Sequence, residues 1–198
     1  MHGLVNRSIQ CFIRDVYGAE VWRQVCADAG IGHADFEAML HYDDADTLAV
    51  LRAAAARLGR EVEALLEDMG HYLVTRPERD ALRRLLRFGG ADFADFLHSL
   101  ADLQERGRLV LPEIDLPQIT VAEEAGGSFT LSFRWGAGLL GPVVLGVLRA
   151  MADDYGMLAL FDHQPAVMPG SPDMICVQLL AAAHSQGRSF ALGRVDGA

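Results

Sequence analysis

The chain has 198 residues, which is enough for one domain with a single hydrophobic core. Hydrophobic residues make up 51% of it and charged residues 22%, a composition typical of a globular protein and not of a disordered one. The 27 acidic and 17 basic residues give a net charge of -10, and every basic residue is arginine. Because an acidic protein repels phosphate backbones, we expect no nucleic-acid partner.

The sequence predicts a cytoplasmic protein. Its longest apolar run, residues 139–148, is too short to cross a bilayer and contains glycine and proline, so no membrane span is expected. The first residues lack a basic stretch followed by an apolar one, so no signal peptide is expected either. Cys11, Cys26 and Cys176 are an odd number without metal-ligand spacing, which favours a reducing compartment and small buried thiols.

Apolar residues recur every three or four positions through the first half of the chain, which predicts successive amphipathic helices. Gly18 is expected to end the first of them, and Asp46 to cap the third. Pro77 suits the first turn of the fifth. The predicted helices before residue 90 are 4–16, 21–26, 48–58, 62–73 and 77–88.

A longer helix is expected from about Asp92; its apolar pattern is lost at Gly107, and the helix is expected to have ended by Pro112. The pattern then changes to that of short strands. A helix returns over 139–151. The predicted strands are 119–121, 129–133, 157–161, 174–180 and 189–195. The expected fold class is therefore α+β, with a helical N-terminal part (about 1–111) packed on a small antiparallel sheet (about 112–198). The long helix lies between them, and no linker divides the chain, so we expect one domain over 1–198.

The residue chemistry alone predicts no catalytic site. No phosphate-binding loop, nucleophile elbow or His-Glu-x-x-His motif is present, and the seven histidines are scattered. Asp43, Asp44 and Asp46 lack the rest of a calcium loop, so they are expected to form a solvated turn. His71, near the end of an apolar helix, either lines a pocket or is an ordinary core or surface histidine. We therefore do not expect an enzyme.

Several segments in sequence order resemble parts of one family. They are residues 1–10, 17–22, 29–31, 65–72, 96–103 and 139–148. Together they are similar to the heme nitric oxide/oxygen binding (H-NOX, heme NO-binding) domains, and the similarity extends to about residue 155. The resemblance implies the H-NOX fold and a sensor or regulatory function. It also implies a separate signalling partner, such as a histidine kinase or a cyclic-nucleotide enzyme.

The resemblance also implies positions for a cofactor site. Family members hold a heme between the helical part and the sheet, with iron bound by a histidine on the long signalling helix. A Tyr-x-Ser-x-Arg strand binds the heme propionates. In this sequence the iron-ligand position is Gln104, and the strand positions are Phe133, Trp135 and Ala137. The other pocket positions implied by the resemblance are Val5, His71, Leu73, Leu100 and Pro117.

These replacements change the chemistry expected of the pocket. An amide is a poor iron ligand compared with a neutral imidazole. Losing an arginine–carboxylate contact removes about 1.5–3 kcal/mol. His98 precedes Gln104 by six residues, about 240° around a helix, whereas Gln104 lies about 40° from Leu100 on the apolar face. His98 is therefore expected to face solvent and not to replace the missing ligand.

Three functional hypotheses remain open at this point. The first is an H-NOX-like sensor with a rebuilt pocket for another tetrapyrrole, such as a corrinoid, because residues 136–138 are small. The second is a ligand-free interaction module whose old cavity is filled by Phe133 and Trp135, each worth about 2–3 kcal/mol on burial. The third is a conventional heme sensor with an unusual iron ligand, for which His71 is the candidate.

Overall fold

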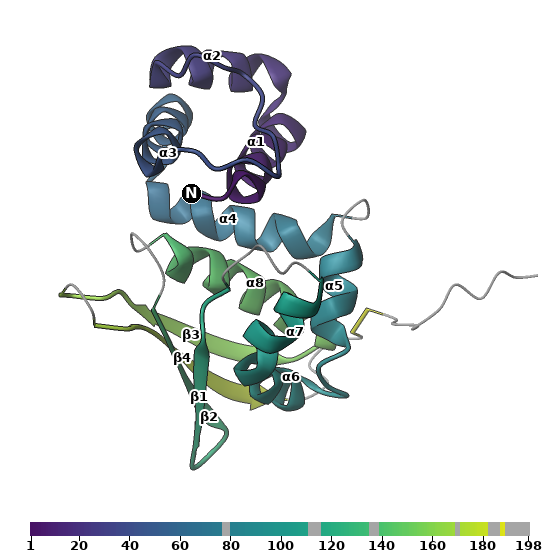
Figure 1. Ribbon diagram of the computed structural model, residues 1–198. Helices are drawn as coiled ribbons and strands as arrows, with labels where there is room; N and C mark the ends of the chain where they lie inside the picture. The colour runs from purple at the N-terminus through teal and green to yellow at the C-terminus, as the bar shows by residue number, and fades with distance from the viewer. Residues whose placement is uncertain (77–79, 111–115, 135–138, 169–170, 182–186, 189–198) are drawn as a thin grey trace, which may run out of the picture. The chain divides into compact units, whose positions relative to one another are not determined.

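The computed structural model of the protein (Figure 1) describes residues 1–76, 80–110, 116–134, 139–168, 171–181 and 187–188. It contains two compact parts, Met1–Met69 and Gly70–Ala198, and the boundary between them falls inside helix α4 (Val62–Thr75). No helix among the described residues is both long enough and apolar enough to span a bilayer.

The first part is helical, as predicted. It consists of α1 (Gly3–Tyr17), α2 (Ala19–Ala29), α3 (Asp44–Leu58) and the beginning of α4. Gly18 separates α1 from α2 with a positive φ of 101°, a backbone conformation that favours glycine. The core of this part is formed by apolar side chains from all four helices: Ile9, Phe12, Ile13, Trp22, Val25, Val50, Leu51, Leu65 and Leu66.

The predicted cap of α3 is wrong by three residues. Asp43, and not Asp46, is the capping residue, and its carboxylate accepts a hydrogen bond of 2.9 Å from the backbone N–H of Ala45. Asp43 has the extended backbone that an N-cap requires, whereas Asp46 already lies in the first helical turn. Carboxylates in a first turn also stabilise a helix, through its dipole, so the sequence pattern did not separate the two roles.

The second part combines an antiparallel sheet with helices, which confirms the α+β class. Its four strands have the order β1-β2-β4-β3, and every pairing is antiparallel. The strands are β1 (Ile119–Glu124), β2 (Ser128–Phe133), β3 (Leu158–Gln164) and β4 (Asp173–Ala181). The helices are α5 (Asp80–Arg87), α6 (Phe93–Ser99), α7 (Leu103–Val110) and α8 (Leu140–Tyr155). Four predicted strands are confirmed, while the fifth (189–195) and Pro77 lie outside the described residues.

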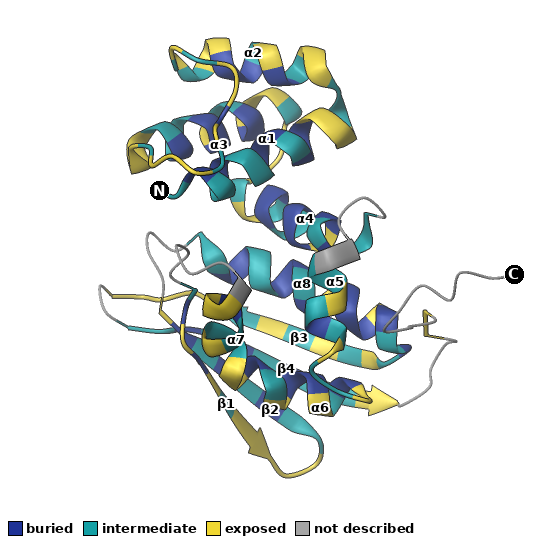
Figure 2. Cartoon of the chain, turned by 45° about the vertical axis from the view of Figure 1, so that its right-hand side comes forward, coloured by how far each residue is buried: buried dark blue, intermediate teal, exposed yellow. Residues whose placement is uncertain are grey.

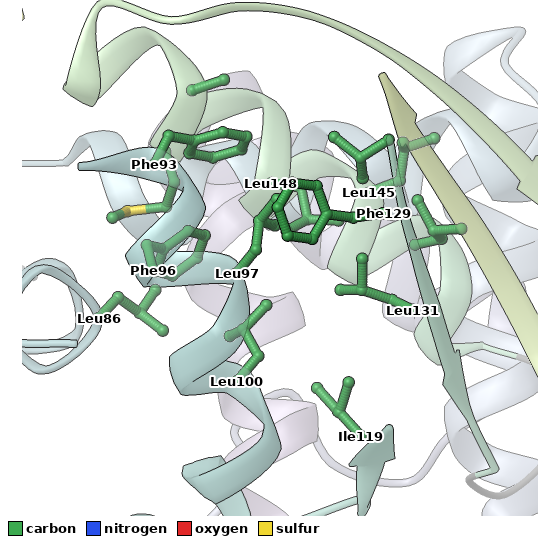
Figure 3. Packing of buried hydrophobic residues seen from close by; sticks show 14 of the residues in the cluster. Leu86, Phe93, Phe96, Leu97, Leu100, Ile119, Phe129, Leu131, Leu145 and Leu148 are labelled. Carbon is green, nitrogen blue, oxygen red and sulfur yellow. The ribbon is translucent and has the colours of Figure 1, made fainter. Parts of the chain in front are cut away.

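One face of the sheet packs against α6 and α8. Figure 3 shows side chains of these two helices meeting those of β2, and the central strand β2 alternates between buried and half-buried residues. The edge strands β1 and β3 carry more exposed positions, coloured yellow in Figure 2. The buried side chains labelled in Figure 3 from these elements are Phe93, Phe96, Leu97, Phe129, Leu131, Leu145 and Leu148.

The long helix expected from about Asp92 is broken. A 3-10 turn, Leu100–Asp102, separates α6 from α7, and α7 continues through Gly107 to Val110. This end agrees with the expectation that the helix is over by Pro112, a residue outside the described part of the chain. A Cβ at Gly107 would lie 2.2 Å from the Leu116 Cδ1 atom, so the glycine provides space for a tertiary contact and does not stop the helix.

Candidate functional site

Gln104 is the second residue of α7 and is half-buried. Its side-chain nitrogen, Nε2, donates a hydrogen bond of 2.8 Å to the backbone oxygen of Leu116. This distance is normal for an N–H···O bond. The amide therefore joins the start of α7 to the segment that leads into β1.

The segment bound by Gln104 continues into the sheet. Pro117 is buried directly after Leu116, and Ile119 begins β1 with only 4% of its surface exposed. Leu116 also packs on Gly107, one turn beyond Gln104 on α7. The two residues of α7 thus contact the backbone oxygen and the side chain of one leucine.

Phe133 is the last residue of β2 and pairs with Ile119 on one side and Asp173 on the other. Its ring is 2% exposed and belongs to the main hydrophobic cluster, which also contains Leu100. The position presents a purely apolar surface, without the hydroxyl of a tyrosine. Trp135 and Ala137, the other two predicted strand positions, lie outside the described residues.

The remaining predicted pocket residues differ in burial. Leu100 is 3% exposed, while Leu73 is half-buried on α4. His71 is exposed on the same helix. Val5 belongs to the first part and is half-buried on α1. Within the second part, Gln104 is hydrogen-bonded to Leu116, the residue directly before Pro117. Leu100 and Phe133 belong to one hydrophobic cluster.

His98 faces solvent, as predicted. Its side chain is 52% exposed, and its Nε2 atom lies 3.1 Å from a carboxylate oxygen of Glu123. The ring meets Phe129 edge to face, with 5.3 Å between ring centroids. Across the part of the chain that the structure describes, no group of three or more His, Cys, Asp or Glu side chains could hold a metal ion.

The three cysteines are free thiols. Cys26 is buried as expected, but Cys11 and Cys176 are only half-buried. Burial raises the pKa of Cys26 from 9.0 to about 11, and the negative charge of Asp35 adds to the effect. A thiol with so high a pKa stays protonated and unreactive at neutral pH.

The sequence analysis missed a buried ionic contact in the second part. Asp154 of α8 is 1% exposed, and its two carboxylate oxygens face Arg83 at 2.8 Å and Arg87 at 3.3 Å, both on α5. The Arg87 guanidinium lies 3.6 Å from the centre of the Tyr155 ring, and the Tyr155 hydroxyl donates to the Gly90 oxygen at 2.9 Å. Burial raises the Tyr155 pKa, while Arg87 opposes that shift. The four-residue spacing of the two arginines is the sequence signal for one shared helix face.

Residues 2–160 match the family model described as Haem-NO-binding (HNOB). The chain belongs to this family. Among curated proteins it is similar to soluble guanylate cyclase 89Db of Drosophila melanogaster, with 23% identity over 155 residues. It is also similar to guanylate cyclase soluble subunit beta-2 of Rattus norvegicus, with 25% identity over 141 residues. These matches cover 78% and 69% of this chain but 23% and 21% of the relatives, so the chain spans less than a quarter of their length.

Solved structures of H-NOX proteins have the same fold. A mutant H-NOX protein from S. oneidensis in the Fe(II) state superposes with a TM-score of 0.76 at 16% identity, over 92% of this chain and 97% of that one. The Fe(II) unliganded H-NOX protein from K. algicida gives a TM-score of 0.76, also at 16% identity, over 94% of this chain and 100% of that one. The predicted H-NOX fold is confirmed.

Proposed function

We propose that this protein is an H-NOX sensor or regulatory domain with a rebuilt pocket that does not hold histidine-ligated heme. The observation that carries the proposal is the hydrogen bond from Gln104 Nε2 to the Leu116 oxygen. An amide nitrogen is a hydrogen-bond donor without an available lone pair. The remaining amide oxygen of Gln104 is a hard ligand, less suited to heme iron than an imidazole nitrogen. The residue at the ligand position therefore does not fit heme iron.

The position expected to bind the propionates supports the same proposal. A heme carries two propionates, which are stabilised by hydroxyl and guanidinium donors. Phe133 offers neither donor and is buried in the hydrophobic cluster. A carboxylate beside this ring would lose its bound water without gaining a hydrogen bond from the protein. Burying a charge in this way costs on the order of several kcal/mol.

For the ligand, we propose a tetrapyrrole that does not need these contacts, such as a corrinoid that brings its own axial ligands. The small residues 136–138 motivate this choice. A ligand-free interaction module is the second candidate, and the burial of Phe133 to 2% exposure favours it because the ring already fills space in the core. In both cases we propose that the domain regulates a separate signalling protein, such as a histidine kinase or a cyclic-nucleotide enzyme, and catalyses no reaction itself.

Visible spectroscopy tests the proposal. The protein is purified with heme precursor supplied, and then titrated separately with hemin and with cobinamide. We expect no stoichiometric heme, and a spectral shift with cobinamide if a corrinoid binds. The absence of a change with either compound supports the ligand-free module. Full-stoichiometry heme with an iron–nitrogen bond to the protein contradicts the proposal.

Two variants identify the source of any heme signal. Loss of the signal in His71→Ala would show that this histidine is the ligand and would support the conventional sensor instead. His98→Ala is the matched control, because His98 is also exposed but pairs with Glu123. We expect the two variants to have the same spectrum as the unmodified protein.

A further inference from the structure

An arginine side chain bridges the break between α6 and α7. In an α-helix the Leu103 N–H would donate to the oxygen of Ser99, four residues earlier. Here it donates to Leu100, three residues earlier, as in a 3-10 turn. The Ser99 oxygen, which caps this 3-10 turn, also accepts a hydrogen bond of 2.7 Å from the guanidinium of Arg106.

Arg106 and Gln104 thus bind the segments that precede and follow α7. Arg106 reaches back to Ser99, the last residue of α6, and Gln104 reaches forward to Leu116, just before Pro117. Both donors lie in the first half of α7, and both acceptors are backbone oxygens outside it. Two tight contacts accompany these bonds. A Cβ at Gly89 would lie 2.1 Å from Ser99 Oγ, and one at Gly107 would lie 2.2 Å from Leu116 Cδ1.

We infer that Gln104 is a positioning residue that, together with Arg106, fixes α7 against its neighbouring segments without any cofactor. The side chain at the family's iron-ligand position binds the protein's own backbone, so the placement of α7 depends on hydrogen bonds and not on a metal bond. This inference rests on the proposed function, because in a domain with histidine-ligated heme the side chain at position 104 would bind iron and not the protein backbone.

Amide hydrogen exchange of the full chain tests this positioning role in Gln104→Glu. The glutamate side chain has nearly the same shape, but its carboxylate accepts hydrogen bonds and donates none, so it repels the Leu116 oxygen. We expect exchange in α7 and in residues 116–119 to become roughly five- to tenfold faster, while α1–α3 are unchanged. Gln104→Ala, which removes the donor without adding a charge, is expected to give a smaller change in the same residues.

Gln178→Glu is a matched control for this experiment. Gln178 also donates from a side-chain amide to a backbone oxygen, that of Gly126 at 3.0 Å, but it lies in β4. Its substitution is expected to speed exchange near the β1–β2 turn and to leave α7 unchanged. If Gln104→Glu and Gln178→Glu both speed exchange in every element, the substitutions lower the stability of the whole protein, and this result contradicts a specific positioning role for Gln104.

The outcomes separate this inference from the proposed function. Unchanged exchange in α7 of both Gln104 variants overturns the positioning role, even if the protein binds no heme. A heme bound through a protein nitrogen in the unmodified chain overturns the proposed function, whatever the exchange rates show. Faster exchange confined to α7 and residues 116–119, together with the absence of heme, supports both.

Discussion

Two positions at which the family resemblance implies cofactor contacts have changed in opposite ways. Gln104 is polar, half-buried and hydrogen-bonded to a backbone oxygen, whereas Phe133 is apolar and 2% exposed within the main hydrophobic cluster. One position stabilises the fold through a directed bond, and the other through packing. The difference teaches that a position assigned to a cofactor by resemblance can stabilise the fold by either kind of interaction, and the two kinds respond differently to substitution.

Truncation at the packed position is expected to have the largest effect. Phe133→Ala removes a buried ring and leaves a cavity between β2 and the helices, so we expect a loss of about 3–5 kcal/mol in the free energy of unfolding. Urea denaturation followed by circular dichroism measures it. Phe133→Leu, which keeps most of the apolar volume, is expected to lose less than half as much. A loss below 1 kcal/mol in the alanine variant would show that the ring is not part of the core.

The elements of the second part were predictable because periodicity is local. The strands around Gly126 and the helix after residue 139 follow from alternation and three- or four-residue spacing, and the structure confirms them. The break at Leu100–Asp102 was not predictable. The bond between Arg106 and Ser99 and the packing of Leu116 on Gly107 were not predictable either, because the apolar pattern does not encode them.

The burial of the candidate site residues could be predicted, but their contacts could not. Alignment with the family placed Gln104 and Phe133, and their burial follows from the apolar faces on which they lie. The acceptor of Gln104 could not be predicted, because Leu116 is twelve residues away and only the folded chain brings them together. Gly107 illustrates the same limit, since a glycine that ends a helix and one that admits a neighbouring side chain look alike in sequence.

Adding a hydroxyl at the packed position sharpens the comparison. Phe133→Tyr introduces the group expected from the family resemblance into an apolar cluster. If the hydroxyl is buried without a partner, the free energy of unfolding should fall by about 1–3 kcal/mol. Thermal and urea unfolding of this variant, compared with the unmodified protein, measure the cost of the added hydroxyl. An unchanged stability would indicate that a hydrogen-bond partner is available beside the ring.

At the polar position we expect a smaller effect. Gln104→Met keeps an unbranched side chain of similar length but cannot donate to the Leu116 oxygen, so about 0.5–1.5 kcal/mol of stability should be lost. Glu105→Met, at the exposed neighbouring position on α7, is the control and should change stability by less than about 0.5 kcal/mol. Equal effects in the two variants would show that the hydrogen bond contributes nothing measurable to stability.

The smallest expected effect concerns pH and a site outside the compared pair. Gln104 and Phe133 are uncharged, so neither makes stability depend on pH, but Cys26 does. Its pKa is about 11 in the folded protein against 9.0 for an unperturbed thiol, so unfolding releases a proton between these values and stability falls as the pH rises from 9 to 11. At pH 9.5 the loss of stability from this group is under about 1 kcal/mol.

Urea unfolding of the unmodified protein and of Cys26→Ala at pH 7 and pH 9.5 measures this loss. The alanine variant should lose less stability between the two pH values, and an equal loss would show that the buried thiol does not titrate in this range.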